Sequence, residues 1–173
     1  MLTKRGIAAV SLQWRSIAKW NNQNQLFMTK TEKIRIVLAD DHELIRQTWK
    51  LLLQKDPRFE VIAECSNGAE LIELLAKTFP DIILLDINMS PVNGFEATRK
   101  IMNQWPHARI IGMSINDQVV YPKNLIKLGA KGYVTKDCTR QEVTDAIIEV
   151  MKGQQYICEA IKKKMQKNSS FKK

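Results

Sequence analysis

The sequence has few cysteines and no long apolar run. Three of its 173 residues are cysteine, Cys65, Cys138 and Cys158, and this odd set contains no closely spaced pair. The pattern disfavours a disulfide framework and a zinc site, and it favours a reducing compartment such as the cytoplasm. The longest apolar runs, such as Ile82 to Leu85, fall far short of the roughly 20 residues that cross a bilayer. No membrane-spanning segment is therefore expected.

Acidic residues are scarce at both ends of the chain. Residues 1–33 have a net charge of +5 and residues 162–173 one of +6, so residues 34–161 carry −2 of the formal net charge of +9. A slightly acidic middle does not present the basic stripe that DNA binding needs. The two basic ends are interpreted as solvated, mobile tails.

The N-terminal extension, residues 1–32, is expected to be disordered or partly an amphipathic helix. Apolar residues at positions 7, 10, 14 and 17 have helical spacing. The basic start also resembles a weak signal peptide, but polar residues interrupt its apolar run and no clear cleavage site follows. Met28 stands six residues before the first expected strand and is a third option, as the natural start of translation.

From Ile34 onward, apolar runs bounded by turn residues alternate with segments of helical period, which is typical of repeated βα units. Strands are predicted near Ile34–Ala39, Glu60–Cys65, Ile82–Asp86, Arg109–Ser114 and Gly132–Thr135. Helices are predicted near Glu43–Gln54, Ala69–Thr78, Phe95–Gln104, Val119–Leu128 and Arg140–Lys152. The strands are nearly all apolar, which indicates a parallel sheet covered on both faces. The fold class is therefore α/β, with a doubly wound sheet of five parallel strands.

Polar residues stand where four of these strands end. Asp40 and Asp41 follow the first strand, Asp86 ends the third, Ser114 the fourth, and Lys136 follows the fifth. Ligands of such sheets bind at the carboxyl ends of the strands. Three carboxylates that converge there repel one another unless a divalent cation neutralises them, and oxygen ligands favour Mg²⁺.

The same residues predict a phosphoryl acceptor. Lys136 can offer a positive charge, and the Ser114 hydroxyl a hydrogen bond, to an anionic group carried by Asp86. Positioning and charge neutralisation carry most of phosphoryl-transfer catalysis, so a covalent aspartyl phosphate is the implied state. Any one of these residues alone is more often a helix cap or turn former. Five such residues at the ends of four strands are not explained in that way.

Four motifs, in order, carry a family resemblance: LADDHELIR, IILLDINMSPVNGFEAT, IIGMS and GAKGYVTKD. Asp41 and Asp86 are 45 residues apart, Asp86 and Ser114 are 28 apart, and Ser114 and Lys136 are 22 apart. Through these motifs residues 33–153 closely resemble the receiver domain of two-component response regulators, of the NarL/FixJ type. Ser90 before Pro91 is a departure that concerns only one loop.

The resemblance implies a flavodoxin-like (βα)5 fold with strand order 2-1-3-4-5. It implies that Asp86 accepts phosphate from a sensor histidine kinase or phosphotransfer protein, and that the backbone carbonyl of Asn88 joins Asp40, Asp41 and Asp86 around Mg²⁺. It also implies a switch pair, in which Ser114 moves toward the phosphoryl group and Tyr133 then turns inward.

Two competing functions are an aspartyl-phosphate phosphatase and a DNA-binding transcription factor. Phosphatases that resemble haloacid dehalogenases place a second aspartate two positions after the nucleophile, where this chain has Asn88, so a turnover enzyme is disfavoured. Residues 154–173 are expected to be a linker-like basic tail, too short for a three-helix DNA-reading unit. The chain is thus expected to be a stand-alone or truncated regulator that acts through protein contacts, including a homodimer, without sequence-specific DNA binding.

Overall fold

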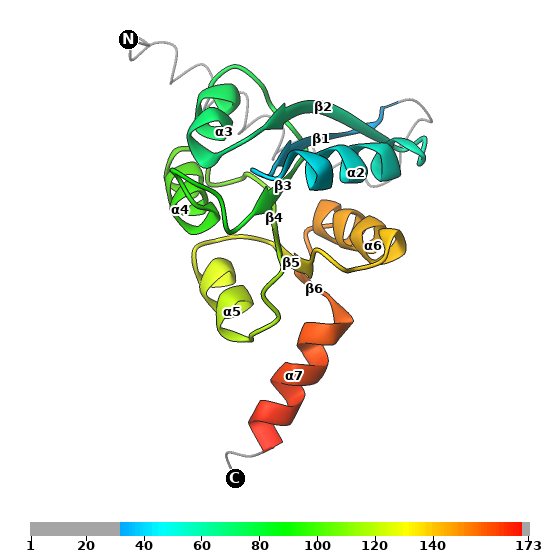
Figure 1. Cartoon of the computed structure of the whole chain (residues 1–173), viewed down its shortest axis with the longest axis vertical. Helices are drawn as coiled ribbons and strands as arrows, with labels where there is room; N and C mark the ends of the chain where they lie inside the picture. Colours follow the sequence, from blue (N-terminus) through cyan, green and yellow to red (C-terminus); the bar gives the residue numbers. More distant parts are fainter. Residues whose placement is uncertain (1–31, 171–173) are drawn as a thin grey trace.

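The computed structural model describes residues 32–170, with side chains up to residue 167 (Figure 1). The expectations for residues 1–31 lie outside the described residues. None of the helices in the described part combines the length and apolar character that crossing a bilayer requires.

One parallel sheet forms the centre of the molecule, in the order β2-β1-β3-β4-β5-β6. The prediction of five parallel strands in the order 2-1-3-4-5 is confirmed, and the structure adds a sixth, short strand beside β5. The strands are β1 (Ile34–Ala39), β2 (Phe59–Cys65), β3 (Ile82–Asp86), β4 (Ile110–Ser114), β5 (Gly132–Thr135) and β6 (Tyr156–Ile157).

Helices cover both faces of the sheet. Figure 1 shows α2 and α6 on one face and α3, α4 and α5 on the other. Side-chain caps fix where several helices begin: the Asn93 side chain accepts the N–H of Glu96, and Thr139 and Glu142 form a capping box. The helices are α2 (Glu43–Gln54), α3 (Gly68–Leu75), α4 (Gly94–Gln104), α5 (Val120–Lys127), α6 (Arg140–Met151) and α7 (Glu159–Ser170).

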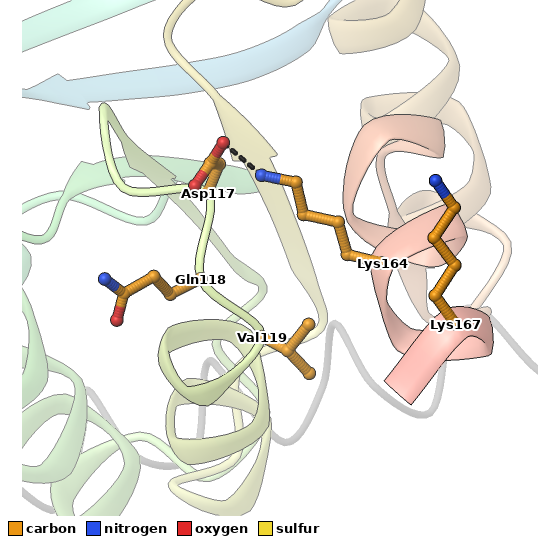
Figure 2. A pocket seen from close by; sticks show the side chains of 5 residues that line it. All are labelled: Asp117, Gln118, Val119, Lys164 and Lys167. Carbon is orange, nitrogen blue, oxygen red and sulfur yellow. Dashed lines mark hydrogen bonds and ion pairs between the residues drawn. The ribbon is translucent and has the colours of Figure 1, made fainter. Parts of the chain in front are cut away.

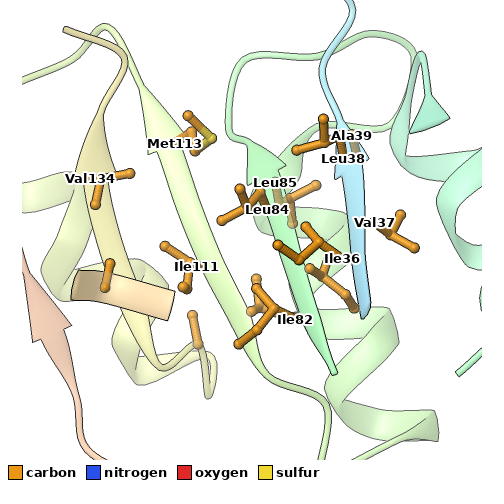
Figure 3. Packing of buried hydrophobic residues seen from close by; sticks show 14 of the residues in the cluster. Ile36, Val37, Leu38, Ala39, Ile82, Leu84, Leu85, Ile111, Met113 and Val134 are labelled. Atoms are coloured by element: carbon orange, nitrogen blue, oxygen red, sulfur yellow. The ribbon is translucent and has the colours of Figure 1, made fainter. Parts of the chain in front are cut away.

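The central strands β3 and β4 are buried on both faces, as their apolar sequences require. All five residues of β3 and of β4 are buried, and Ile36, Leu84 and Ile111 belong to one continuous core (Figure 3). A rigid centre of this kind holds the polar residues at the strand ends in fixed positions. Gly94 contributes to this, because a Cβ there would collide with the carbonyl oxygen of Asp86.

Residues 154–173 were expected to be a linker-like basic tail, and in the part that the structure describes, up to residue 170, they form a short strand and a helix. Strand β6 pairs with β5, with Tyr156 opposite Gly132, and α7 follows it. Cys158 and Ile161 are fully buried, and Met165 packs against the core. These apolar residues lie three and four positions apart within a lysine-rich segment, so the segment has one apolar stripe that its overall composition conceals.

Candidate functional site

Three carboxylates meet at the carboxyl ends of β1 and β3. Asp40 and Asp41 follow β1, and Asp86 is the last residue of β3. One carboxylate oxygen from each, together with one ring nitrogen of His42, lies within 4.8 Å of the others. Asp40 and Asp86 are buried whereas Asp41 is exposed, so the cluster is open to solvent on one side.

Lys136 bridges the two buried carboxylates. Its Nζ lies 2.7 Å from Oδ2 of Asp40 and 2.8 Å from Oδ2 of Asp86, and its side chain is 8% exposed. Burial lowers the pKa of this ammonium, but hydrogen bonds to Asp40 and Asp86 outweigh burial, so the pKa is raised above its ordinary value. The lysine is therefore charged, and it offsets part of the repulsion between the two carboxylates.

Both carboxylate oxygens of Asp86 accept a hydrogen bond. Oδ2 accepts the bond from Lys136, and Oδ1 accepts the backbone N–H of Asn88 at 3.1 Å. Burial raises the pKa of the Asp86 carboxyl, although the bonds from Lys136 and Asn88 oppose that shift. The result is an oriented carboxylate at the edge of the core.

Ser114 and Tyr133 lie beside this site and are joined through one residue. The Ser114 hydroxyl accepts the backbone N–H of Asn116 at 3.0 Å and the side-chain amide of Asn88 at 3.4 Å. Tyr133 donates its hydroxyl to the carbonyl oxygen of Asn116 at 2.6 Å. Burial raises the pKa of Tyr133 to about 12, so the phenol remains a donor. Tyr133 is fully buried.

The structure thus brings all the predicted site residues to one end of the sheet, and it adds residues that the sequence did not indicate. Asn116 acts through its backbone, which carries no side-chain signal. Arg46 donates Nη1 to the carbonyl oxygen of Asp40 at 2.6 Å. Its helical position alone did not distinguish it from other surface arginines.

A second unpredicted contact ties α7 to the loop that holds Asn116. Lys164 forms an ion pair with Asp117, across a small pocket whose other lining residues are Gln118, Val119 and Lys167 (Figure 2). Both side chains of the pair are partly exposed, so its energy is small. The ion pair nevertheless places Lys164 and Lys167 of α7 next to the residues that follow Ser114.

The chain matches known proteins over the part that holds this site. Residues 36–148 match the family model of the response regulator receiver domain. The transcriptional regulatory protein DegU of Brevibacillus brevis is 41% identical over 125 residues, which are 72% of this chain and 53% of DegU. Response regulator UvrY of Escherichia coli is 33% identical over 132 residues, 76% of this chain and 61% of UvrY. This chain therefore spans between half and two thirds of the length of these relatives.

Among solved structures, a LuxR-family two-component response regulator from Aurantimonas sp. SI85-9A1 is similar with a TM-score of 0.77 and 29% identity, over 80% of this chain and 99% of that one. The receiver domain of the putative response regulator NarL from Mycobacterium tuberculosis has a TM-score of 0.68 and 30% identity, over 72% of this chain and all of that one. Sequence and structure agree, and the chain belongs to the response regulators of two-component systems through its receiver domain.

Proposed function

We propose that this receiver domain is a phosphoacceptor switch in which Asp86 takes a phosphoryl group from a sensor histidine kinase or a phosphotransfer protein. One observation carries the proposal: Lys136 Nζ bridges Asp40 and Asp86, at 2.7 and 2.8 Å. A buried carboxylate with a fixed cation on one oxygen is the arrangement that a phosphoryl acceptor needs, because the cation also attracts the oxygens of the incoming group.

In the proposed step, a carboxylate oxygen of Asp86 attacks the phosphorus of a phosphohistidine. The new O–P bond forms as the P–N bond breaks, and the electron pair of that bond stays on the imidazole nitrogen, which takes up a proton. Lys136 stabilises the charge on the phosphoryl oxygens. The Ser114 hydroxyl, which accepts a hydrogen bond from the Asn88 side chain, can rotate and donate to the same phosphoryl oxygens.

The donor set fits Mg²⁺. Asp40, Asp41 and Asp86 offer carboxylate oxygens within 4.8 Å of one another, and the backbone carbonyl of Asn88 is the proposed further ligand. When bound, Mg²⁺ neutralises charge between the carboxylates and the phosphoryl oxygens. His42 is less suited as a ligand, because its Nδ1 lies 2.8 Å from Oδ1 of Asp41 and pairs with that carboxylate.

The proposed role is that of a switch rather than a turnover enzyme. An amide stands two residues after Asp86, and the Asn88 side chain donates to Ser114, so this position cannot shuttle the proton that a phosphatase of the haloacid-dehalogenase kind needs. Protein contact near the site is supported by two exposed apolar side chains, Leu44 at 79% and Ile115 at 77% exposure. Whether the partner is a kinase or a second copy of this chain, these residues are suited to meet it.

Intact-mass measurement after incubation with acetyl phosphate and Mg²⁺ tests the proposal. We expect one phosphate adduct on the parent chain, none on Asp86→Asn, and none on the parent in EDTA. Asp137→Asn is the matched control, because Asp137 is an exposed aspartate next to Lys136, and it should label like the parent. Equal labelling of Asp86→Asn, or full labelling in EDTA, would show that the assignment is wrong.

A further inference from the structure

Two cysteines that are 20 positions apart in the sequence converge on one hydroxyl group. The Oγ1 of Thr135, at the end of β5, lies 3.3 Å from Sγ of Cys138 and 4.0 Å from Sγ of Cys158. Both cysteines are free thiols. The third cysteine, Cys65, is buried at the end of β2, and strands β1, β3 and β4 separate β2 from β5 in the sheet.

The backbone fixes both cysteines to the same strand. The N–H of Cys138 donates to the carbonyl oxygen of Thr135, and the N–H of Cys158 donates to that of Tyr133, each at 3.0 Å. Thr135 and Tyr133 both belong to β5, so the two thiols are held in place by one rigid strand. The main-chain positions of both cysteines are therefore set by the fold.

The two thiols differ in access and in chemistry. Cys138 is partly exposed in the loop between β5 and α6, whereas Cys158 is fully buried. Cys158 directly precedes α7, and its carbonyl oxygen accepts the N–H groups of Ile161 and Lys162. Thiols at helix N-termini have lowered pKa values. Here the hydrogen bond from the Cys138 thiol is the main cause that lowers the pKa of Cys158, to about 6, while the same bond raises the pKa of Cys138.

We propose that Cys138 and Cys158 form a reversible redox pair, which a low-molecular-weight disulfide converts into an intramolecular disulfide. Cys138 is the sulfur that the oxidant can reach, and Cys158 is the sulfur that closes the bond. The pair is a modification site of this chain that is separate from the carboxylate cluster.

The reaction proceeds in two balanced exchange steps. Cys138 passes its proton to the Cys158 sulfur along the hydrogen bond between them, and its thiolate then attacks one sulfur of the oxidant. The S–S bond of the oxidant breaks, and the first small thiol leaves as a thiolate that takes up one proton. The sulfur of Cys158 then attacks the sulfur of Cys138, the mixed disulfide breaks, and the second small thiol leaves with the second proton. The protein is oxidised by two electrons and the small disulfide is reduced to two thiols.

The disulfide would fix the start of α7 covalently to the loop that follows Lys136. In the reduced chain, this junction is held by β6, by the burial of Ile161 and by the Lys164–Asp117 ion pair. Oxidation would therefore add a covalent bond to a junction that is already docked. A reducing agent such as dithiothreitol would break that bond and leave the other contacts in place.

Peptide mapping of the full chain tests the pair directly. The reduced chain is incubated with oxidised glutathione and its intact mass is measured; it is then unfolded, free thiols are blocked with iodoacetamide, and trypsin is added. Trypsin cleaves after Lys136, Arg140, Lys152 and Lys162, so the two sulfurs fall on separate peptides. We expect one linked pair of peptides, an intact mass lower by two hydrogen atoms, and an alkylated Cys65.

Three variants distinguish the roles of the sulfurs. Cys158→Ser should retain a glutathione adduct on Cys138, because no second sulfur can displace it. Cys138→Ser should take up no glutathione while folded, because Cys158 is buried. Cys65→Ser is the matched control and should form the same disulfide as the parent.

Several results would overturn the proposal: a link that involves Cys65, a disulfide between two chains, a glutathione adduct that persists on Cys138 of the parent, or no reaction at all. Mapping on the parent chain decides between these even if a variant fails to fold. None of the measurements uses phosphorylation, so their outcome is independent of the proposed function of Asp86.

Discussion

Tyr133 and Ser114 both bind the backbone of Asn116. The Tyr133 hydroxyl donates to its carbonyl oxygen, and the Ser114 hydroxyl accepts its N–H. A movement of Ser114 toward a phosphoryl group would give up the N–H, while Tyr133 would still hold the carbonyl. The loop after β4 is thus the element whose position both residues determine.

Removing the Tyr133 hydroxyl should loosen this loop without emptying the core. In Tyr133→Phe the ring still fills its site, but the carbonyl oxygen of Asn116 loses its bond of 2.6 Å, at a cost of about 1 kcal/mol in the free energy of unfolding. We expect faster amide exchange over residues 115–119. Tyr121→Phe is the control, because its partly exposed ring contacts Phe95, and its effect should stay below about 0.5 kcal/mol. Equal exchange in the two variants would contradict the assigned role.

Replacing Lys136 by methionine should destabilise the metal-free protein strongly. Asp40 and Asp86 would lose their shared cation in a buried site, which costs about 3 kcal/mol. Adding Asp86→Asn should recover part of that loss, because one of the two charges is then absent. Urea unfolding of the four proteins in EDTA measures the coupling. Lys152→Met is the control, since Lys152 is 60% exposed, and purely additive effects at Lys136 and Asp86 would refute the bridge.

Stability should depend on pH through Asp56. Hydrogen bonds from the Arg58 side chain hold the pKa of this carboxyl below its ordinary value of 3.8. The folded state therefore binds the proton less tightly than the unfolded state, so the contribution is complete above the ordinary value and is lost as the pH falls through the lowered one. At neutral pH, Asp56→Asn should be less stable than the parent by at most about 1 kcal/mol, because Arg58 is half exposed.

Urea unfolding of both proteins from pH 7 downward checks this. The difference between parent and Asp56→Asn should shrink below about pH 4 and vanish at lower pH. Asp137→Asn serves as the reference, because Asp137 is an exposed aspartate. A difference that stays constant down to the acid transition would mean that the Asp56–Arg58 pair contributes nothing.

Any binding of this chain to DNA should be weak and independent of sequence. The described lysines of α7 could contact phosphates, but Lys162 already pairs with Glu159 and Lys164 with Asp117. Such contacts position a protein without specifying sequence, and their affinity falls steeply with salt. In a competition gel shift, Lys163→Gln with Lys167→Gln should weaken binding equally for all fragments, and Lys77→Gln should not. Retention of one fragment against excess unrelated DNA would contradict the prediction.

The sheet and the carboxylate site were predictable because each depends on local signals. The apolar runs of β1, β3 and β4 are long enough to identify buried strands, and a general property of parallel sheets places Asp40, Asp86 and Lys136 at one edge. The docking of α7 and the role of Asn116 were not predictable, each for its own reason. The lysines of α7 hide the short apolar stripe that docks it, and Asn116 acts only through its backbone.

The proximity of Cys138 and Cys158 was not predictable either, because it depends on how two strands pair. Only after β6 is aligned with β5, with Ile157 opposite Tyr133, does Cys158 arrive next to Thr135. A shift of that alignment by one residue would turn the sulfur to the other face of the sheet. The sequence contains no signal that fixes the alignment of a strand of two residues.

Strand β6 also affects whether a second copy of the chain can add a strand to the edge of the sheet. It occupies the margin of β5, where an unpaired backbone would otherwise invite a foreign strand to add to the sheet. Among the described residues the two edge strands of the sheet are β6, which has only two residues, and β2, which has Glu60 and Glu64 in its seven residues. Glu64 already pairs with Lys50 and Arg46, so Glu60 is the acidic residue of this edge that two copies brought together would set near each other. A foreign strand would therefore find only two residues to pair with at the β6 edge and acidic side chains along the β2 edge.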